Sequence, residues 1–141
     1  MKLKLITFVF FCISFIHCNS QNQTSDKLDL TWDTVGISNN SLYLIKTTYE
    51  TKSEEEMTIW IKVVNAPKKA KDRITKVATL DKILYGFDCN GRKIKVIAYV
   101  HYSLNGKVLK NRTIEEWEQK WINIVPETIG EMLFTKACSM E

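Results

Sequence analysis

Two Asn-Gly pairs within residues 83–111 constrain this chain more than any other feature of its sequence. The stretch reads ILYGFDC-NG-RKIKVIAYVHYSL-NG-KVLKN, three runs of strand-forming residues separated by the two pairs. Asn-Gly between alternating apolar residues is typical of a β-hairpin with a type I′ turn, because that turn needs φ > 0 at both central positions. The sequence therefore predicts an antiparallel meander over residues 83–111.

The first turn also predicts a register. With Asn90 and Gly91 as the two loop residues, the expected pairs are Cys89 with Arg92, Phe87 with Ile94, Tyr85 with Val96 and Ile83 with Ala98. The last three pairs are apolar and share one face of the ladder. That face is expected to continue through Val100, Tyr102 and Leu104. In the second hairpin the expected pairs are Tyr102 with Leu109 and Val100 with Asn111, so the third strand should fray or bulge early.

The N-terminal segment has the pattern of a secretory signal peptide. Lys2 and Lys4 precede the apolar run 5–16, which is too short to cross a bilayer as an ordinary helix. Two processing sites stay open: signal peptidase cuts after Ser20 and leaves Gln21 first, or Cys18 is the lipidated first residue of a bacterial lipoprotein. We expect a signal peptide at 1–20, a flexible tether at 21–30 and one domain at 31–141.

Export also determines the charge and the cysteine content of the folded part. Two of the 20 basic residues leave with residues 1–20, so 18 remain against 16 acidic residues. This balance argues against nucleic acid as a partner. Cys12 leaves with the signal and Cys18 is cut off or lipidated, so Cys89 and Cys138 remain. In an oxidising compartment two remaining cysteines form a disulfide more often than a metal site or reactive thiols, and we expect that bridge.

Further strands are predicted before the hairpins. Residues 32–37 and 42–51 suit strands, with a turn cluster at 38–41 and a charged, solvated turn at 52–56. The run 57–64 alternates, which puts Met57, Ile59, Ile61 and Val63 on one face and Thr58, Trp60 and Lys62 on the other. Most of the four tryptophans should lie in the core, and Trp60 is the best candidate for exposure.

Residues 65–76 break the strand pattern. Pro67 cannot donate to a ladder, and five basic residues crowd the segment: Lys68, Lys69, Lys71, Arg73 and Lys76. One interpretation is a solvated loop with at most a helical turn. The other is a docking patch for an acidic partner, either a sulfated polysaccharide or a protein.

The C-terminal segment predicts an amphipathic helix. After Pro126, the apolar residues Ile129, Met132, Leu133 and Ala137 recur at helical spacing, which indicates a helix over about 127–138. The segment 114–121 stays open between helix, strand and loop. The predicted fold class is α+β: an antiparallel sheet of about five to six strands, with this helix packed on one face and tied to it by a disulfide.

Several motifs follow one another in a characteristic order. They are Trp32, a strand with Tyr43, Trp60-Ile61-Lys62, Asp88-Cys89-Asn90 at a strand end, a strand with Tyr99 and Tyr102, Asn105-Gly106, an aromatic-rich segment, Pro126-Glu127-Thr128, and a helix ending in Ala137-Cys138. Over residues 31–138 this order resembles the bacterial surface-adhesin protein E family. The resemblance implies a sheet and a helix joined by Cys89 and Cys138. It also implies a surface location, since the founding member is a surface lipoprotein that binds host extracellular-matrix proteins.

Residues for catalysis are sparse. His101 is the one histidine after residue 20, and alternation predicts it at the surface, opposite the core face and beside Tyr99 and Ser103. A general base also needs an orienting partner and a nucleophile. The sequence has no G-x-S-x-G, H-E-x-x-H or Gly-rich phosphate motif, and its cysteines and histidine lack zinc-site spacing. We predict no enzyme, no metal and no cofactor.

The function predicted from these patterns is binding at the bacterial envelope or cell surface. The sharper form is an adhesin that contacts host matrix proteins or polyanions through Trp60 and the basic residues of 65–76. The alternative is a periplasmic or envelope module with a structural role or a small ligand; a small secreted enzyme ranks third. The membrane is contacted only through the signal or a lipid. N-x-S/T triplets at Asn22, Asn39 and Asn111 leave a eukaryotic secreted origin open.

Overall fold

The computed structural model describes residues 31–70, 73–76 and 78–140. In chain order its elements are β1 (Trp32–Ser38), β2 (Ser41–Lys46), β3 (Thr51–Lys52), β4 (Met57–Asn65), β5 (Lys68–Ala70), β6 (Arg73–Lys76), β7 (Thr79–Asp88), β8 (Lys93–Ser103), β9 (Val108–Thr113), the 3₁₀ turn η1 (Glu116–Glu118), β10 (Ile122–Asn123) and α1 (Ile129–Cys138).

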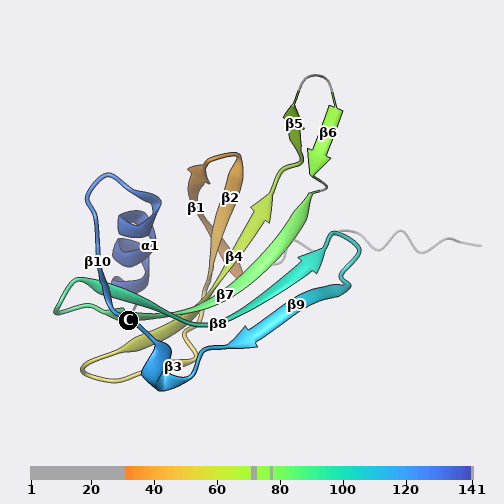
Figure 1. Ribbon diagram of the computed structural model, residues 1–141. Helices are drawn as coiled ribbons and strands as arrows, with labels where there is room; N and C mark the ends of the chain where they lie inside the picture. Colours follow the sequence, from red (N-terminus) through yellow and green to blue (C-terminus); the bar gives the residue numbers. More distant parts are fainter. Residues whose placement is uncertain (1–30, 71–72, 77, 141) are drawn as a thin grey trace, which may run out of the picture.

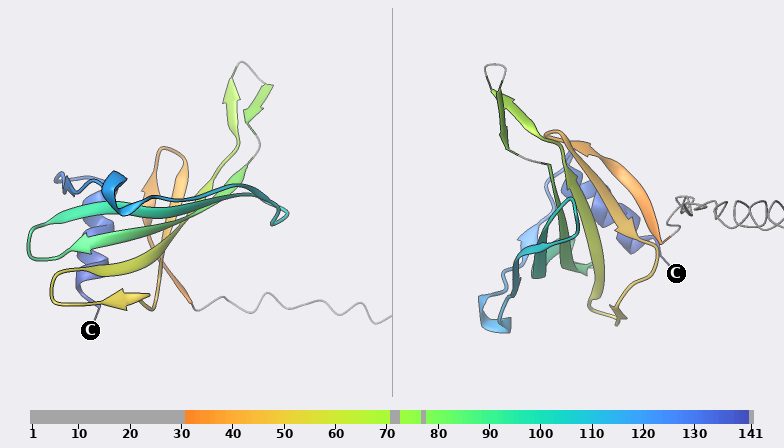
Figure 2. Two further views of the ribbon diagram at one scale, coloured as in Figure 1. Left: turned by 60° about the horizontal axis from the view of Figure 1, so that its bottom comes forward. Right: turned by 90° about the vertical axis from the view of Figure 1, so that its right-hand side faces the viewer.

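The main strands form one curled antiparallel sheet (Figure 1). Its order is β1-β2-β4-β7-β8-β10, and β3 adds to β4. Two strands pair with the edge of β8 that faces away from β7. β10 pairs with the beginning of β8, and β9 pairs with its second half. The helix α1 lies in the hollow of the curl and contacts β1, β2, β4 and β7 (Figure 2). The predicted fold class is confirmed.

Neither Asn-Gly pair forms the predicted two-residue turn. In the first hairpin the loop is 89–92, and Arg92 has a positive φ of 51°. The loop is closed by a hydrogen bond of 2.6 Å from the Gly91 backbone N–H to Asp88 Oδ1. A four-residue loop keeps the register of a two-residue loop. The pairs Phe87 with Ile94 and Tyr85 with Val96 are therefore confirmed, while Cys89 and Arg92 lie in the loop.

The type I′ turn occurs earlier in the chain. Asn39 and Asn40 have φ values of 50° and 61° and lie between the paired residues Ser38 and Ser41. Asparagine tolerates the left-handed region better than most residues, because its short side chain hydrogen-bonds locally. The predicted turn cluster at 38–41 thus has the geometry that was expected of the Asn-Gly pairs.

The second hairpin has a three-residue loop, 104–106, with Gly106 at φ 82°. The Gly106 N–H donates to the Ser103 carbonyl at 3.0 Å, a type I turn followed by a left-handed glycine. The odd loop length shifts the register by one, so Tyr102 pairs with Val108 and not with Leu109. A bulge beside His101 then restores the predicted pair of Val100 with Asn111. The predicted early bulge is confirmed.

A bulge at Ile97 changes which side chains of β8 share the core face. Val96 pairs with Tyr85 but Ala98 pairs with Leu84, so the described ladder skips Ile97. Because side chains alternate with period two, one extra residue moves all later side chains to the other face.

Three predictions are wrong because of this bulge. Ile83 pairs with Tyr99 and not with Ala98. Val100 and Tyr102 lie on the face opposite the core. Leu104 also misses the core face, but for a separate reason, since it lies in the exposed loop after β8. His101 lies on the core side of the sheet, where it pairs with Asp81.

Residues 65–76 do not form the predicted solvated loop. β5 and β6 pair with each other and project beyond the sheet as a hairpin between β4 and β7 (Figure 1). Pro67 lies outside both strands, so its missing N–H breaks no ladder. β2 ends at Lys46 and not at residue 51, so this strand is shorter than predicted. The segment 114–121, which the sequence left open between helix, strand and loop, contains the short turn η1.

The helix α1 begins two residues later than predicted. Glu127 has a φ of 59°, outside the helical region, and Thr128 is the N-cap. Thr128 Oγ1 accepts a hydrogen bond from the Glu131 N–H at 3.3 Å, and Glu131 Oε2 accepts one from the Glu127 N–H at 2.9 Å. These two bonds satisfy backbone N–H groups that an uncapped helix start would leave without partners.

The core lies between α1 and one end of the sheet. The apolar face of β4 is buried as predicted, and it packs with side chains from β2, β7 and α1. Together these strands and the helix contribute the buried core residues Ile45, Met57, Ile59, Ile61, Val63, Phe87, Leu133, Phe134 and Ala137. No tryptophan belongs to this set, since Trp32 and Trp60 are half-buried and Trp117 and Trp121 are exposed. The prediction that most tryptophans are core residues is wrong.

The predicted disulfide between Cys89 and Cys138 is confirmed, with the two Cα atoms 5.7 Å apart. It joins the loop after β7 to the last residue of α1. Arg92 of the same loop reaches the first turn of the helix, because its Nη2 donates to Glu131 Oε1 at 3.0 Å. Its guanidinium also lies 5.3 Å from the ring centroid of Phe134. One loop therefore holds both ends of the helix.

Removal of the disulfide should lower the free energy of unfolding by about 4 kcal/mol, the chain-entropy value for a bridge with a sequence separation of 49. Urea unfolding of C89A/C138A measures this loss. A reductant should destabilise the native protein equally and leave the double variant unchanged. Equal unfolding midpoints for the native protein and the double variant would show that the bridge adds no stability.

Stability should also fall at alkaline pH because of Tyr85. Burial, and to a lesser extent the neighbouring Tyr43, raises the pKa of Tyr85 above its ordinary value. The unfolded chain loses this proton near pH ~10 while the folded chain retains it, so the free energy of unfolding falls as the pH rises through that range and is unaffected below it. The variant Y85F should show a shallower alkaline loss in urea unfolding, and Y49F, which changes an exposed tyrosine, should not. Identical pH slopes for native protein and Y85F would contradict the assignment.

Candidate functional site

The sheet face opposite α1 carries aromatic and basic side chains from neighbouring strands. Trp32 pairs with Lys46 across β1 and β2, and Lys82 pairs with Val100 across β7 and β8. Paired residues of an antiparallel sheet point to the same side. A hollow of about 360 Å³ on this face is the tryptophan–lysine cavity, and its lining consists of Trp32, Lys46, Trp60, Lys82, Val100 and Tyr102.

The lysine ammonium groups lie close to the aromatic rings. Lys62 Nζ is 4.2 Å from the ring centroid of Trp32, and Lys82 Nζ is 5.9 Å from the same ring and 5.6 Å from that of Tyr102. Lys46 is paired with Glu50 at 2.6 Å. Within residues 31–70, 73–76 and 78–140, no carboxylate lies at ion-pair distance from Lys82. The cavity wall thus combines positive charge with flat apolar surface.

Trp60 is part of this wall and is only half-buried, but it is not the most exposed tryptophan. Trp117, in η1, is 82% exposed, and Trp121 is 40% exposed. The short η1 turn and the extended residues after it leave both of these side chains at the surface. The prediction of Trp60 as the best candidate for exposure is therefore wrong, although its face was predicted correctly.

Four of the five predicted basic docking residues, Lys68, Lys69, Arg73 and Lys76, lie in the β5–β6 hairpin. Lys68 pairs with Lys76 and Lys69 with Ile74 in the backbone ladder, and Arg73 begins β6. Lys71 lies outside the described residues. The hairpin brings the lysines of two strands to adjacent positions, which the prediction of a loop did not include.

His101 has an orienting partner that its sequence position did not reveal. Its Nδ1 is hydrogen-bonded to Asp81 Oδ1 on the neighbouring strand. Asp81 Oδ2 accepts from Asn65 Nδ2 at 2.8 Å, and Asn65 Oδ1 accepts from Ser41 Oγ at 2.7 Å. This row crosses β2, β4, β7 and β8 and gives the carboxylate and the amide their partners. A general base also needs a nucleophile, and the Ser41 hydroxyl donates to Asn65 instead of His101.

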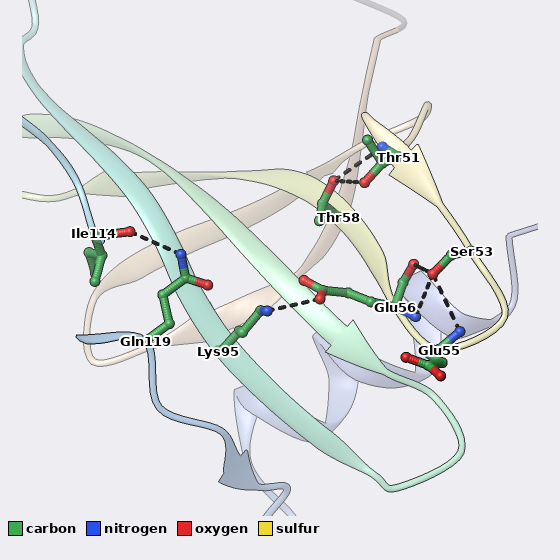
Figure 3. A network of polar contacts seen from close by, with 8 residues as sticks. All are labelled: Thr51, Ser53, Glu55, Glu56, Thr58, Lys95, Ile114 and Gln119. Atoms are coloured by element: carbon green, nitrogen blue, oxygen red, sulfur yellow. Dashed lines mark hydrogen bonds and ion pairs between the residues drawn. The ribbon is translucent and has the colours of Figure 1, made fainter. Parts of the chain in front are cut away.

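A second hollow, of about 500 Å³, lies beside the β3–β4 turn and the Trp121 side chain. Its polar groups already contact one another (Figure 3). Ser53 Oγ accepts from the Glu56 N–H at 3.0 Å, and Glu56 Oε2 lies 2.8 Å from Lys95 Nζ. Lys95 Nζ is 4.5 Å from the Trp121 ring centroid. Glu54 and Glu55 are exposed, in agreement with the predicted solvated turn.

In the part of the chain that the structure describes, no three or more His, Cys, Asp or Glu side chains are grouped so that they could hold a metal ion. The described helix is too short and too polar to cross a membrane. Cys18, the predicted lipidation site, lies outside the described residues.

Sequence reasoning found one wall of the tryptophan–lysine cavity and missed the others. The alternation of β4 correctly placed Trp60 and Lys62 on its polar face. Lys46 and Lys82 each stand next to a core isoleucine, which is a signal for the same face. No sequence signal placed Val100 and Tyr102 there, since that depends on the bulge at Ile97.

Comparison with known proteins identifies a family. No curated protein and no solved structure matches the chain. The sequence model of the surface-adhesin protein E family matches residues 32–139, a range that runs from β1 to the end of α1 and includes both bridged cysteines. A match over most of the chain, with the predicted bridge in place, establishes the family. The chain belongs to the surface-adhesin protein E family.

Proposed function

We propose that this protein is a bacterial surface adhesin that acts by binding a host macromolecule and not by catalysis. Family membership suggests a surface adhesin and is the observation that carries the proposal. The signal-peptide pattern of residues 1–20 supports export. Cys18 offers a lipid anchor, and cleavage after Ser20 would release the chain instead.

The β5–β6 hairpin is the part of the fold proposed to contact the partner first. It projects beyond the sheet (Figure 2), and its sequence carries Lys68, Lys69, Lys71, Arg73 and Lys76. A basic projection attracts a polyanion from a distance and orients it before closer contacts form. The proposed partner is therefore a sulfated polysaccharide or an acidic surface of an extracellular-matrix protein.

Neutralising the hairpin should weaken this binding. The variant K68Q/K69Q/R73Q should bind immobilised heparin or matrix protein about tenfold more weakly, because charge-assisted contacts are lost. Surface plasmon resonance at two salt concentrations measures the affinity, and the variant should also be less sensitive to salt. The matched control K93Q/K107Q/K120Q removes the same charge elsewhere and should retain most of the affinity. Equal effects of the two triple variants would remove the hairpin from the proposed site.

An adhesin should be reachable from outside the cell. Protease added to intact cells should cleave the protein, while a periplasmic marker stays intact. Protection of the chain together with that marker would favour the alternative of a periplasmic module. Mass spectrometry of the mature N-terminus then identifies the attachment, either lipid on Cys18 or a free Gln21.

A further inference from the structure

We propose that the tryptophan–lysine cavity binds one acidic sugar unit, a pyranose ring that carries a carboxylate or a sulfate group. This inference rests on the proposed binding function and adds a second site on the sheet, with a defined class of ligand. The site is separate from the β5–β6 hairpin, since the lining residues come from β1, β2, β4, β7 and β8.

The aromatic walls favour a sugar ring. Trp32, Trp60 and Tyr102 stand on three different strands around one hollow. An aromatic face is electron-rich, and the C–H groups on one side of a pyranose carry partial positive charge, so the two surfaces stack. Side chains fixed on paired strands lose little freedom when a ligand stacks on them.

The lysines favour an acidic substituent on that ring. Lys82 contacts the rings of Trp32 and Tyr102, and the structure gives it no carboxylate among the described residues. An anion at the cavity wall would give Lys82 an ion pair that the described residues do not provide. Lys46 already has Glu50, so its charge is largely compensated. We therefore assign the contact with the anionic group of the sugar to Lys82.

The size of the cavity separates a sugar from other anions. A volume of about 360 Å³ is at the small end of the range for ligand sites, which suits a ring with one exocyclic group. An acidic peptide would use charge without ring stacking, and it would bind lysines across the surface without needing the aromatic walls. Stacking and charge at one place indicate a ligand that has a flat apolar face and an anionic group together.

The experiment uses the folded domain with three tetrasaccharide probes in isothermal titration calorimetry. The probes are hyaluronan tetrasaccharide, heparin tetrasaccharide, and hyaluronan tetrasaccharide with its carboxylates reduced to alcohols. At least one acidic probe should bind with a single-site isotherm and change tryptophan fluorescence, and the neutral probe should bind about tenfold more weakly. Equal binding of the neutral and acidic probes, or no binding of any probe, would overturn the proposal.

Variants test the assigned residues. K82Q should weaken the acidic probe about tenfold, and K110Q, which removes a lysine over Tyr99 on the other face of the sheet, should not. W60F should retain binding and W60A should lose it, with circular dichroism and the unfolding midpoint as checks of folding. If W60A does not fold, Y102L removes a ring from the wall while it keeps an apolar strand residue. Equal losses in K82Q and K110Q would reduce the effect to general charge and overturn the site.

Two further experiments test the location of the site and the class of its ligand. K68Q/K69Q/R73Q should bind the acidic tetrasaccharide as tightly as the native protein does, even though it binds immobilised heparin weakly. Loss of tetrasaccharide binding in that variant would place the sugar site on the hairpin and overturn the assignment to the cavity. Poly-glutamate at matched charge should not displace the tetrasaccharide, and full displacement would indicate an acidic peptide instead. All of these measurements use purified protein, so a periplasmic location would contradict the adhesin without affecting them.

Discussion

The attachment of α1 to the loop 89–92 is the constraint on which the rest of the structure depends. A ten-residue helix is marginal in water on its own, so its stability must come from packing. The disulfide fixes its last residue, and Arg92 fixes its first turn through Glu131 and covers the ring of Phe134. Both contacts come from one tight hairpin loop. The left-handed backbone of Arg92 is thus part of the mechanism that closes the core.

The helix covers only one end of the core-side face, and this divides the sheet by chemistry. Under the helix the face is apolar, from Ile45 and Ile59 to Phe87. Beyond it, the same face carries the row of Ser41, Asn65, Asp81 and His101, in which the polar side chains hydrogen-bond to one another across four strands. Groups that are half-buried without a covering helix need such partners, because desolvation without a hydrogen bond is costly. The row therefore explains how these polar groups are accommodated on the core-side face.

How much the sequence predicted depended on whether a feature was local. The alternation of β4, the helix after Pro126 and the two remaining cysteines predicted the sheet, the helix and the bridge, because each rests on periodicity or on cysteine number. The turn at residues 89–92 was predicted with the wrong geometry but the right register, since loops of two and four residues preserve the same pairing. The bulge at Ile97 had no sequence signal. β8 is a continuous run of strand-forming residues, and only its pairing with β7 reveals the extra residue.

The bulge at Ile97 determines which side chains of β8 lie on the sheet face opposite α1. With regular pairing, Val100 and Tyr102 would point into the curl with Ile83, and Tyr99 and His101 would stand beside Lys82. The extra residue reverses this arrangement. Val100 and Tyr102 lie beside Lys82, and Tyr99 and His101 lie on the core side of the sheet. A cation beside aromatic rings is weakly stabilised, by roughly 0.5–1 kcal/mol at an exposed site, and remains able to form an ion pair. The same irregularity that the hydrophobic pattern could not reveal therefore brings positive charge, aromatic surface and a hollow together on this face of the sheet.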